Sequence, residues 1–321
     1  MILSNDKLVA LEVFAKWDMS KPFILGGYAG TGKTTLIKHM LQPGDIVAAF
    51  TNKAVSVLQS KGIPALTIHN LLYQKVCDEP LTFIKKPRLI ANRIFIDESS
   101  MLGASIRADL ESYRVPIVYV GDPFQLPPVN DGDSIITNPT FCLTEINRQA
   151  ADSPIISLAN KIRTTGKWPH TVDRYEVDYS KYDIVICYKN ITRFNLNRKI
   201  RKDDGPAKPG DVVSLMKTCY HTGIAGGEIG IIASMERPYR FTVTFDQGSR
   251  RFNNAKFIKA NQSPYAKELT GKQVFDFGHV ITCHKAQGSQ FDKVLVIDEG
   301  CDPRWMYTAV TRAISHVDIA G

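Results

Sequence analysis

The feature that most constrains this chain is a glycine-rich stretch close to its N-terminus, GGYAGTGKTT. Residues 27–34 fit the spacing G-x-x-x-x-G-K-[ST], and they follow a short apolar run at residues 23–25. A helical pattern begins directly afterwards, at residues 35–41. In such a strand–loop–helix the glycines let backbone N–H groups surround phosphate oxygens, and the helix N-terminus favours their negative charge. The stretch therefore predicts a nucleotide site at the edge of a parallel sheet in an α/β fold.

The side chains and the backbone of this loop have separate expected roles. Lys33 is expected to reach the β and γ phosphates of ATP, and the hydroxyl of Thr34 is expected to ligate Mg²⁺. A chance glycine-rich turn is the alternative, and the flanking strand and helix argue against it. Further contacts to the nucleotide are expected from the rest of the loop, namely Gly27, Ala29, Gly30, Thr31, Gly32 and Thr35.

The pair Asp97-Glu98 follows a second apolar run, at residues 94–96. A carboxylate at the end of a strand can hold Mg²⁺ through water, and its neighbour can orient and deprotonate the attacking water. We assign Asp97 to the metal and Glu98 to the general base. Two solvated acids at a strand end are the alternative, and the nearby glycine-rich loop argues against them.

Three further polar side chains fit the chemistry of phosphoryl transfer. The amide of Gln125, in the segment YVGDPFQLPPV, can sense the γ-phosphate or position water, although Asp122 and Gln125 also fit an ordinary turn. Arg148 and Arg312 can place positive charge on the developing transition state. Taken alone, each arginine fits an ordinary surface position better than a functional one.

Apolar runs that end in polar clusters continue along the chain and indicate two α/β domains. They lie at residues 46–50, 94–96, 117–120, 184–187, 294–297 and 317–319. Buried parallel strands have this pattern, and ligands bind beyond their carboxyl ends. We expect a first domain at residues 1–71 and 93–150, and a second domain at residues 151–201 and 273–321.

Two segments interrupt this pattern and are interpreted as insertions. Residues 72–92 are polar, basic and punctuated by proline. Residues 202–272 contain short β segments with turn signals, such as KPGDVV, AGGEIGII and RFTVTF. This composition predicts a small antiparallel barrel within the second domain.

Composition narrows the class of partner and the compartment. The net charge of +8 and the pI of about 9.1 favour a polyanion, with nucleic acid first. The six cysteines form no CxxC pair, which indicates reduced core residues and a reducing, cytoplasmic compartment. Nothing resembles a signal peptide, and no apolar run approaches the roughly 20 residues that cross a bilayer, so no membrane association is expected.

Eight segments occur in the order of the motifs of superfamily 1 helicases, and the chain resembles that family. The segments are GGYAGTGKTT, AAFTNKAV, TIHNLL, IFIDESSML, YVGDPFQLPPV, LTEINRQ, ITCHKAQGSQFDKV and WMYTAVTRA. Within the family the chain is most similar to the RecD-like branch and to phage Dda-type helicases, above all in LTEINRQAADSPIISLANKIRTTGKW. The resemblance covers residues 23–313 and implies two RecA-like domains, a duplex-splitting pin at residues 72–92 and a barrel at residues 202–272.

The resemblance also implies roles for individual residues. Arg148 and Arg312 correspond to two arginines that reach the γ-phosphate across the cleft between the RecA-like domains, and Gln125 to a glutamine that couples hydrolysis to DNA contacts. Gly288 is placed at the nucleotide, and Phe83 is a candidate wedge in the pin, with a buried aromatic as the equal alternative. Single-stranded DNA is expected to lie along Thr51, Asn52, Thr67, His69, Thr282, His284 and Gln287, flanked by Lys285 and Ser289.

The activity implied by the resemblance is ATP hydrolysis stimulated by single-stranded DNA, with 5′-to-3′ travel and duplex unwinding by a monomer. The implied partners are single-stranded and forked DNA, and single-strand-binding or replication proteins are further candidates. A phage origin would place the protein in the host cytoplasm. An RNA helicase, a translocase that does not unwind and a non-motor NTPase switch stay open as alternatives. One departure concerns the nucleotide. The family carries an adenine-recognising glutamine ahead of the P-loop, and LSNDKLVALEVF contains none, which puts strict ATP preference in question.

Overall fold

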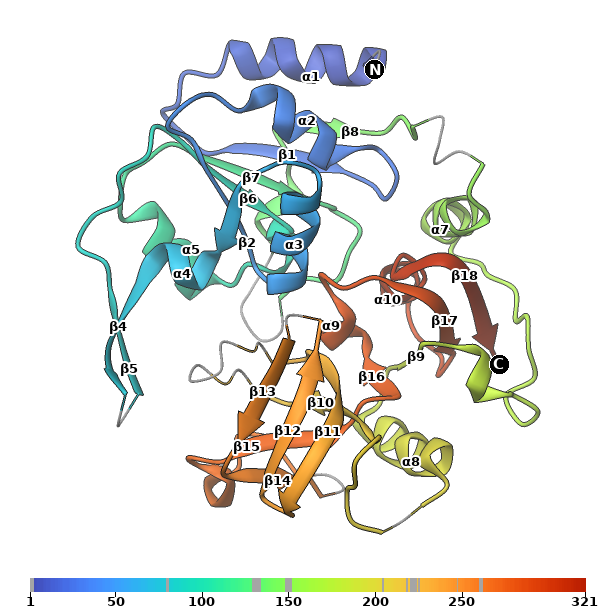
Figure 1. Ribbon diagram of the computed structural model, residues 1–321. Helices are drawn as coiled ribbons and strands as arrows, with labels where there is room; N and C mark the ends of the chain where they lie inside the picture. The colour runs from blue at the N-terminus through green and yellow to red at the C-terminus, as the bar shows by residue number, and fades with distance from the viewer. Residues whose placement is uncertain are drawn as a thin grey trace. The chain divides into compact units, whose positions relative to one another are not determined.

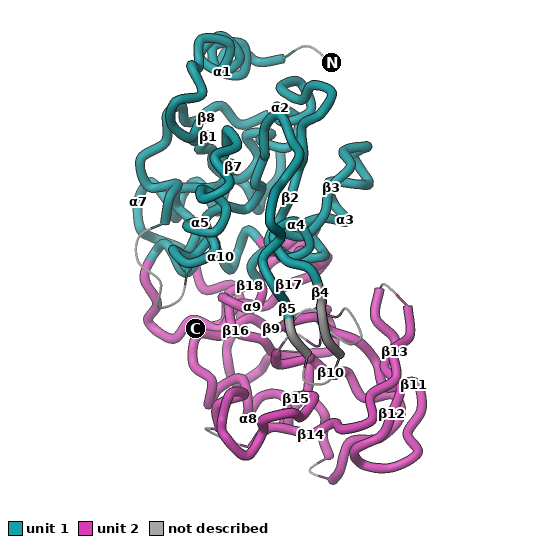
Figure 2. The backbone as a smooth tube through the Cα atoms, turned by 90° about the vertical axis from the view of Figure 1, so that its left-hand side faces the viewer, with its two compact units in different colours: residues 1–168, 287–289, 303–311 teal, residues 169–286, 290–302, 312–321 magenta. Residues whose placement is uncertain are grey.

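The computed structural model describes residues 3–78, 81–128, 134–147, 152–203, 205–217, 219, 224, 226–246, 248–259 and 262–321. The chain divides into two compact units, which Figure 2 shows in teal and magenta. Unit 1 comprises residues 1–168, 287–289 and 303–311. Unit 2 comprises residues 169–286, 290–302 and 312–321.

A parallel six-stranded sheet forms the centre of unit 1 (Figure 1). Its strand order is β3-β2-β6-β7-β1-β8, and every neighbouring pair is parallel. The strands are β1 (Phe23–Gly27), β2 (Ile46–Ala49), β3 (Ala65–Thr67), β6 (Ile94–Asp97), β7 (Ile117–Gly121) and β8 (Phe141–Leu143). Because parallel strands share one direction, the polar segments that follow them meet at one edge of the sheet.

Two apolar clusters pack helices on the two faces of this sheet. One joins alternate strand residues to α1 (Asn5–Ala15), α2 (Lys33–Met40) and α3 (Asn52–Ser60). The other joins the intervening residues to α4 (Ile68–Leu72) and α5 (Ala104–Glu111). On β6, for example, Phe95 belongs to the first cluster, and Ile94 and Ile96 to the second. The continuous apolar strands of the sequence are explained by burial on both faces.

Two further helices of unit 1, far apart in the sequence, pack against one another. They are α7 (Pro154–Thr165) and α10 (Pro303–Val310). Every residue of α10 from Trp305 to Val310 is buried. The C-terminal segment WMYTAV therefore contributes a core helix to unit 1.

A β-hairpin occupies the insertion between α4 and β6. Its strands β4 (Tyr73–Asp78) and β5 (Leu81–Lys85) are antiparallel, and the hairpin projects from unit 1 in Figure 1. Its base is held on α5, because Lys85 Nζ lies 3.1 Å from Asp109 Oδ1 and the Tyr73 hydroxyl also donates to Asp109. Both contacts lower the pKa of Asp109.

Unit 2 contains a smaller parallel sheet with the order β16-β9-β17-β18. Its strands are β9 (Ile184–Cys187), β16 (Val280–Thr282), β17 (Phe291–Ile297) and β18 (Ala313–Ala320), and the adjoining helices are α8 (Asn190–Arg201) and α9 (Cys283–Ala286). The predicted α/β class with parallel sheets is thereby confirmed. No helix in the described ranges is long and apolar enough to cross a membrane.

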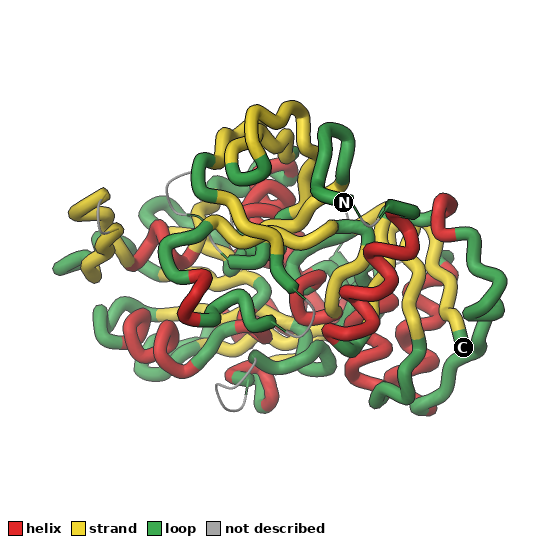
Figure 3. Tube along the Cα trace, turned by 90° about the horizontal axis from the view of Figure 1, so that it is seen from below, coloured by secondary structure: helices red, strands yellow, loops and turns green. Residues whose placement is uncertain are grey.

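The second sheet of unit 2 has six strands in the order β13-β12-β11-β10-β15-β14. They are β10 (Val212–Leu215), β11 (Ile229–Arg237), β12 (Arg240–Phe245), β13 (Gly248–Phe252), β14 (Ala255–Phe257) and β15 (Gln273–Phe277). All neighbours are antiparallel except β14 and β15, and Figure 3 shows strands and loops dominating this part. Its core is aromatic, with Phe252 and Phe275 edge to face at 4.9 Å between ring centroids.

Candidate functional site

The glycine-rich loop lies between β1 and α2, as the sequence predicts. Gly30 and Gly32 have φ angles of 79° and 81°, a left-handed conformation that favours glycine. The loop also closes on itself, since the Thr31 hydroxyl donates to the carbonyl of Tyr28 at 2.8 Å. A Cβ on Gly27 would lie 2.8 Å from that hydroxyl oxygen, so this turn has no space for a side chain.

Lys33 begins α2 and points its ammonium back into this loop. Its Nζ donates to the carbonyl of Gly27 at 2.7 Å and to that of Tyr28 at 3.3 Å. Burial raises the pKa of the carboxyl groups of Asp97 and Asp122, and the positive charge of Lys33 reduces this rise. The ammonium group of Lys33 is therefore held at the end of β1 by neutral carbonyl groups. A phosphate can replace these carbonyls as the hydrogen-bond acceptor.

Asp97 ends β6 and has a side chain that is almost fully buried. Burial and the neighbouring Glu98 raise the pKa of Asp97 to about 6, while its Oδ1 accepts the Glu98 N–H at 3.0 Å. Glu98 has a φ of 54°, a left-handed conformation that is rare for a residue with a side chain. Its buried Oε2 has no hydrogen-bond partner within the described residues. This pair thus holds acceptor capacity that the protein itself does not satisfy.

The donor set fits Mg²⁺ rather than a metal that needs a full protein cage. Asp97 supplies a carboxylate, and the half-buried Thr34 supplies a hydroxyl at the start of α2. No three His, Cys, Asp or Glu side chains cluster as a metal site in the part of the chain that the structure describes. Mg²⁺ is commonly held by one or two protein oxygens, with phosphate oxygens and water completing its shell.

Gln125 and Asp122 lie in the segment that follows β7, and both are buried. Burial raises the pKa of Asp122, whose carboxylate accepts from the Phe124 N–H at 2.9 Å. Oε1 of Gln125 has no hydrogen-bond partner among the described residues. An unsatisfied buried amide is costly, so this side chain is suited to receive a donor such as water.

Tyr307 of α10 links this segment to the glycine-rich loop. Its hydroxyl donates to Asp122 Oδ2 at 2.7 Å and accepts from the Ala29 N–H at 2.8 Å. Thr308 adds a contact, since its hydroxyl oxygen accepts from the Leu126 N–H at 3.0 Å. Sequence reasoning included Tyr307 in the motif WMYTAVTRA without giving it a role. The motif was the available signal, because a tyrosine in a core helix needs a partner for its hydroxyl.

Arg163 is a second residue that sequence reasoning missed. It lies on α7, and its guanidinium carbon is 3.9 Å from the centre of the Tyr28 ring. This cation–π contact stabilises the outer side of the glycine-rich loop. Spacing along the chain offers no signal for the contact, because Arg163 and Tyr28 are brought together only by packing.

Four of the expected strand-contacting residues of unit 1 lie at helix starts. Thr51 and Thr67 cap α3 and α4, where their hydroxyls accept backbone N–H groups at 3.1 and 3.2 Å. His69 packs edge to face against Phe83 at 5.0 Å between centroids, and burial lowers the pKa of its imidazole. Asn52 begins α3 and is half-buried. The strand-binding roles of these residues stay predictions.

Residues 287–289 belong to unit 1 and lie close to the same region. A Cβ on Gly288 would come 2.8 Å from Thr51 Oγ1, and the φ of 72° at Gly288 also favours glycine. Gln287 is buried, and its Nε2 donates to the carbonyl of Leu126 at 3.0 Å. The side chain of Gln287 therefore holds the loop that contains Gln125 by a hydrogen bond to its backbone.

Other predicted residues lie in unit 2, and one lies outside the described residues. Thr282 ends β16 and is buried, and His284 on α9 has a pKa lowered by burial. Arg312 is buried in unit 2 just before β18. Arg148 lies outside the described residues.

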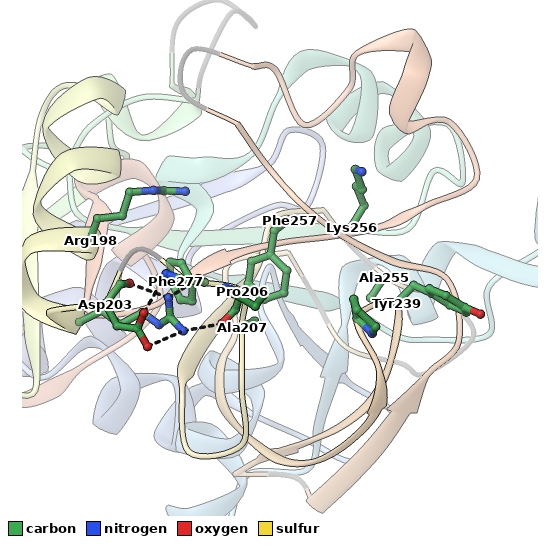
Figure 4. A pocket seen from close by; sticks show the side chains of 12 residues that line it. Arg198, Asp203, Pro206, Ala207, Tyr239, Ala255, Lys256, Phe257 and Phe277 are labelled. Carbon is green, nitrogen blue, oxygen red and sulfur yellow. Dashed lines mark hydrogen bonds and ion pairs between the residues drawn. The ribbon is translucent and has the colours of Figure 1, made fainter.

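Unit 2 also contains a cavity of about 360 Å³ beside the C-terminal end of α8 (Figure 4). Phe257, Phe277 and Arg198 contribute to its lining. Arg201 also lines it, but this guanidinium already donates to Asp211 Oδ1 at 2.9 Å and to three backbone carbonyls. That network fastens the turn after α8, which explains Arg201 as a structural residue.

Comparisons with known proteins agree with this geometry. Residues 15–179 match the model of an AAA domain, and residues 277–319 match a UvrD-like helicase C-terminal domain. The ATP-dependent RecD2 DNA helicase of Deinococcus radiodurans is 28% identical over 359 residues, covering 93% of this chain and 46% of that protein. The ATP-dependent DNA helicase dda of Enterobacteria phage T4 is 32% identical over 201 residues, covering 53% of this chain and 45% of that protein.

The chain thus spans about half the length of these curated relatives. A solved structure of Bacteroides Pif1 helicase in complex with ADP-AlF3 and single-stranded DNA has a TM-score of 0.63 and 20% sequence identity. That likeness covers 100% of this chain and 93% of the other. At this level of identity it shows that the two chains share a fold.

Proposed function

Because the chain carries an AAA domain and belongs to the superfamily 1 helicases of the RecD-like branch, we propose that it hydrolyses ATP to move along single-stranded DNA and to unwind duplexes. The observation that carries the proposal is the geometry of one site in unit 1. Lys33 Nζ donates to two backbone carbonyls of the glycine-rich loop, and Asp97 ends β6 and is followed by Glu98, whose buried Oε2 lacks a hydrogen-bond partner within the described residues. Phosphoryl transfer requires such a site, with a cation for the phosphates beside acidic groups for the metal and the water.

The proposed chemistry uses groups that are unsatisfied or easily released. Lys33 exchanges its two carbonyl partners for β and γ phosphate oxygens when the nucleotide binds. Asp97 and Thr34 hold Mg²⁺, which when bound neutralises developing charge on the phosphates. The unpartnered Oε2 of Glu98 accepts a proton from the attacking water, and the amide of Gln125 orients that water.

Movement along a strand is proposed because expected strand-contacting residues occur in both units. Thr51 and His69 lie in unit 1, while Thr282 and His284 lie in unit 2. If the nucleotide state changes the grip of each unit in turn, the strand is held alternately and advances. Backbone contacts of this kind tolerate sequence, and the charge of +8 favours a polyanion. The branch to which the chain belongs supports 5′-to-3′ travel.

Unwinding is assigned to the hairpin of β4 and β5. The hairpin projects from unit 1 on a fixed base at Asp109, as a wedge that meets a duplex must. Phe83 packs on His69, so its ring links the hairpin to the expected DNA-contacting helix α4.

The first test is steady-state ATP hydrolysis with and without single-stranded DNA, with RNA of equal length for comparison. We expect strong stimulation by DNA alone, and loss of turnover in Lys33→Ala. The exposed Lys16→Ala is the matched control, because it removes the same charge away from the loop. Equal stimulation by RNA would contradict a motor specific for DNA, and turnover indifferent to both strands would contradict a motor.

Unwinding and direction need a second measurement, on duplexes with a 5′ or a 3′ single-stranded tail. We expect strand displacement from the 5′-tailed duplex. Phe83→Ala should reduce displacement more than DNA-stimulated hydrolysis if the hairpin separates bases. Stimulated hydrolysis without displacement on either tail would indicate a translocase that does not unwind.

A further inference from the structure

A buried lysine on α1, Lys7, lies against the glycine-rich loop and has no part in the chemistry proposed above. Its side chain is 3% exposed, and its Nζ donates to Oδ1 of Asn147. A Cβ on Gly32 would lie 3.1 Å from Cε of Lys7 and 2.5 Å from Nδ2 of Asn147. Both side chains therefore cover the glycine at which α2 begins.

The neighbouring backbone fixes Lys7 and Asn147 in this position. The carboxylate of Asp6 accepts the N–H groups of Thr144 at 2.6 Å and Glu145 at 3.0 Å, which ties the start of α1 to the segment after β8. The N–H of Asn147 donates to the carbonyl of Gly30 at 3.0 Å. These hydrogen bonds of Asp6 and of the Asn147 backbone keep Lys7 beside the glycine-rich loop.

Among the described residues, the charge of Lys7 has no partner of opposite sign. Within the described residues no ion pair joins Lys7 to a carboxylate, and the Asn147 amide is neutral. Burying an ammonium group costs free energy unless an anion or several acceptors compensate it. A nucleotide bound in the adjacent loop brings acceptors to this place.

The two side chains together present mainly hydrogen-bond donors. An ammonium group has three donors and no acceptor, and Lys7 takes one of the two lone pairs of the Asn147 amide oxygen. The remaining Nδ2 of Asn147 is a donor as well. Such a donor-rich pair offers little to the exocyclic amino group of adenine, whereas phosphate oxygens, the N7 atom of either purine and the O6 atom of guanine can accept from it.

We propose that Lys7, positioned by Asn147, is a second cationic contact to the bound nucleotide and makes the site accept other nucleoside triphosphates beside ATP. The inference rests on the proposed function and specifies its nucleotide substrate class. A glutamine at the same place would offer an acceptor as well as donors, and would therefore select for adenine.

Calorimetric titration of the full chain with ATP and with GTP, in the absence of DNA, tests this inference. For the parent chain we expect dissociation constants that agree within about tenfold, which corresponds to one hydrogen bond to a charged group. Lys7→Gln should shift the ratio of the two constants towards ATP by about tenfold or more. Lys7→Met should weaken both nucleotides to a similar degree.

The ratio of two nucleotides on one variant is independent of how much of that variant is folded, so a partly unfolded sample leaves the test intact. Lys16→Gln on the same N-terminal segment is the control, and we expect it to leave both constants unchanged. Rejection of GTP by more than about 100-fold in the parent, or an unchanged ratio in Lys7→Gln, would overturn the inference and leave the glycine-rich loop as a nucleotide site. Absence of binding by any nucleoside triphosphate, or unaltered binding in Lys33→Ala, would instead overturn the proposed function.

Discussion

At the scale of single residues, Glu98 combines two properties that are costly and therefore informative. Its backbone has a left-handed φ of 54°, and its buried Oε2 has no partner within the described part of the chain. Strain and an unsatisfied oxygen at the same residue are typical of positions that are kept for chemistry rather than stability. Asp97, its neighbour on β6, has a carboxyl pKa raised to about 6 by burial and by Glu98 itself.

The prediction for Glu98→Gln is retained nucleotide binding with turnover reduced by about 100-fold or more, because the amide cannot take a proton from water. Single-turnover hydrolysis and nucleotide titration measure the two steps separately. The exposed Glu12→Gln on α1 is the matched control. A Glu98→Gln variant that hydrolyses ATP at the parental rate would remove Glu98 as the base.

Lys285 on α9 gives a prediction for pH. Burial, with a smaller effect of Arg193, lowers the pKa of Lys285 from 10.5 to about 8, and its Nζ lies 3.2 Å from the sulfur of Met216. The unfolded chain holds this proton more tightly than the fold does. The charged lysine therefore destabilises the fold fully below pH 8, and this cost disappears as the pH rises towards 10.5.

We therefore expect Lys285→Met to stabilise the protein by about 2 kcal/mol at pH 7, less than the full shift because the side chain is only half-buried. The gain over the parent should shrink as the pH is raised from 8 to 10. Urea unfolding followed by circular dichroism at these pH values measures the difference, with the exposed Lys293→Met as control. A gain that is equal at pH 7 and pH 10 would contradict the assigned cause.

At the scale of elements, helix α10 holds the glycine-rich loop and the segment after β7 in one arrangement. Tyr307 bridges Ala29 and Asp122, and Arg304 Nη2 donates to the carbonyl of Pro123 at 2.5 Å. A helix from the C-terminal part of the sequence thus completes the proposed nucleotide site of unit 1. Its contacts are hydrogen bonds to buried groups, which are costly to leave unmade.

For Tyr307→Phe we expect faster amide hydrogen exchange in the peptide that contains Ala29, and weaker ATP binding. Removal of the hydroxyl leaves a half-buried N–H and a buried carboxylate without this partner, at a cost of about 1–3 kcal/mol. The exposed Tyr175→Phe in unit 2 is the control, and its exchange should match the parent. Unchanged protection of Ala29 in Tyr307→Phe would show that the bridge does not order the loop.

At the scale of the whole molecule, the comparisons confirm the predicted membership of the RecD-like superfamily 1 helicases. Two family models match this chain, one near its start and one near its end. Residues from both matched regions belong to unit 1, because α10 lies within the second match. The net charge of +8 is a property of the whole chain, and it attracts the negatively charged phosphates of a nucleic acid.

We expect the DNA concentration that half-maximally stimulates hydrolysis to rise about tenfold or more between 50 and 300 mM NaCl, because counterions are released when phosphates are neutralised. Turnover without DNA should change little over the same range, since the buried carboxylates of the nucleotide site are screened weakly by salt. Titration of stimulation at several salt concentrations gives the slope. A DNA requirement that salt does not alter would exclude phosphate contacts as the main source of affinity.

The sequence by itself determined the parts of this protein that depend on short spacing. The loop around Lys33 is an example, because a strand, a glycine-rich turn and a helix follow one another within a few residues, and the left-handed angles at Gly30 and Gly32 favour glycine. The alternation of apolar runs likewise predicted parallel sheets with polar residues at one edge, where Asp97 ends β6.

Only the tertiary structure decided which distant residues complete that edge. Tyr307 meets Ala29 across 278 positions of sequence, and Lys7 meets Asn147 across 140. No periodicity relates such pairs, and a tyrosine or a lysine in an amphipathic segment has the same local pattern whether it faces water or a phosphate-binding loop. Their partners follow from the packing of whole helices, because the burial of α1 and α10 brings these polar groups to the loop and leaves them no water to bind.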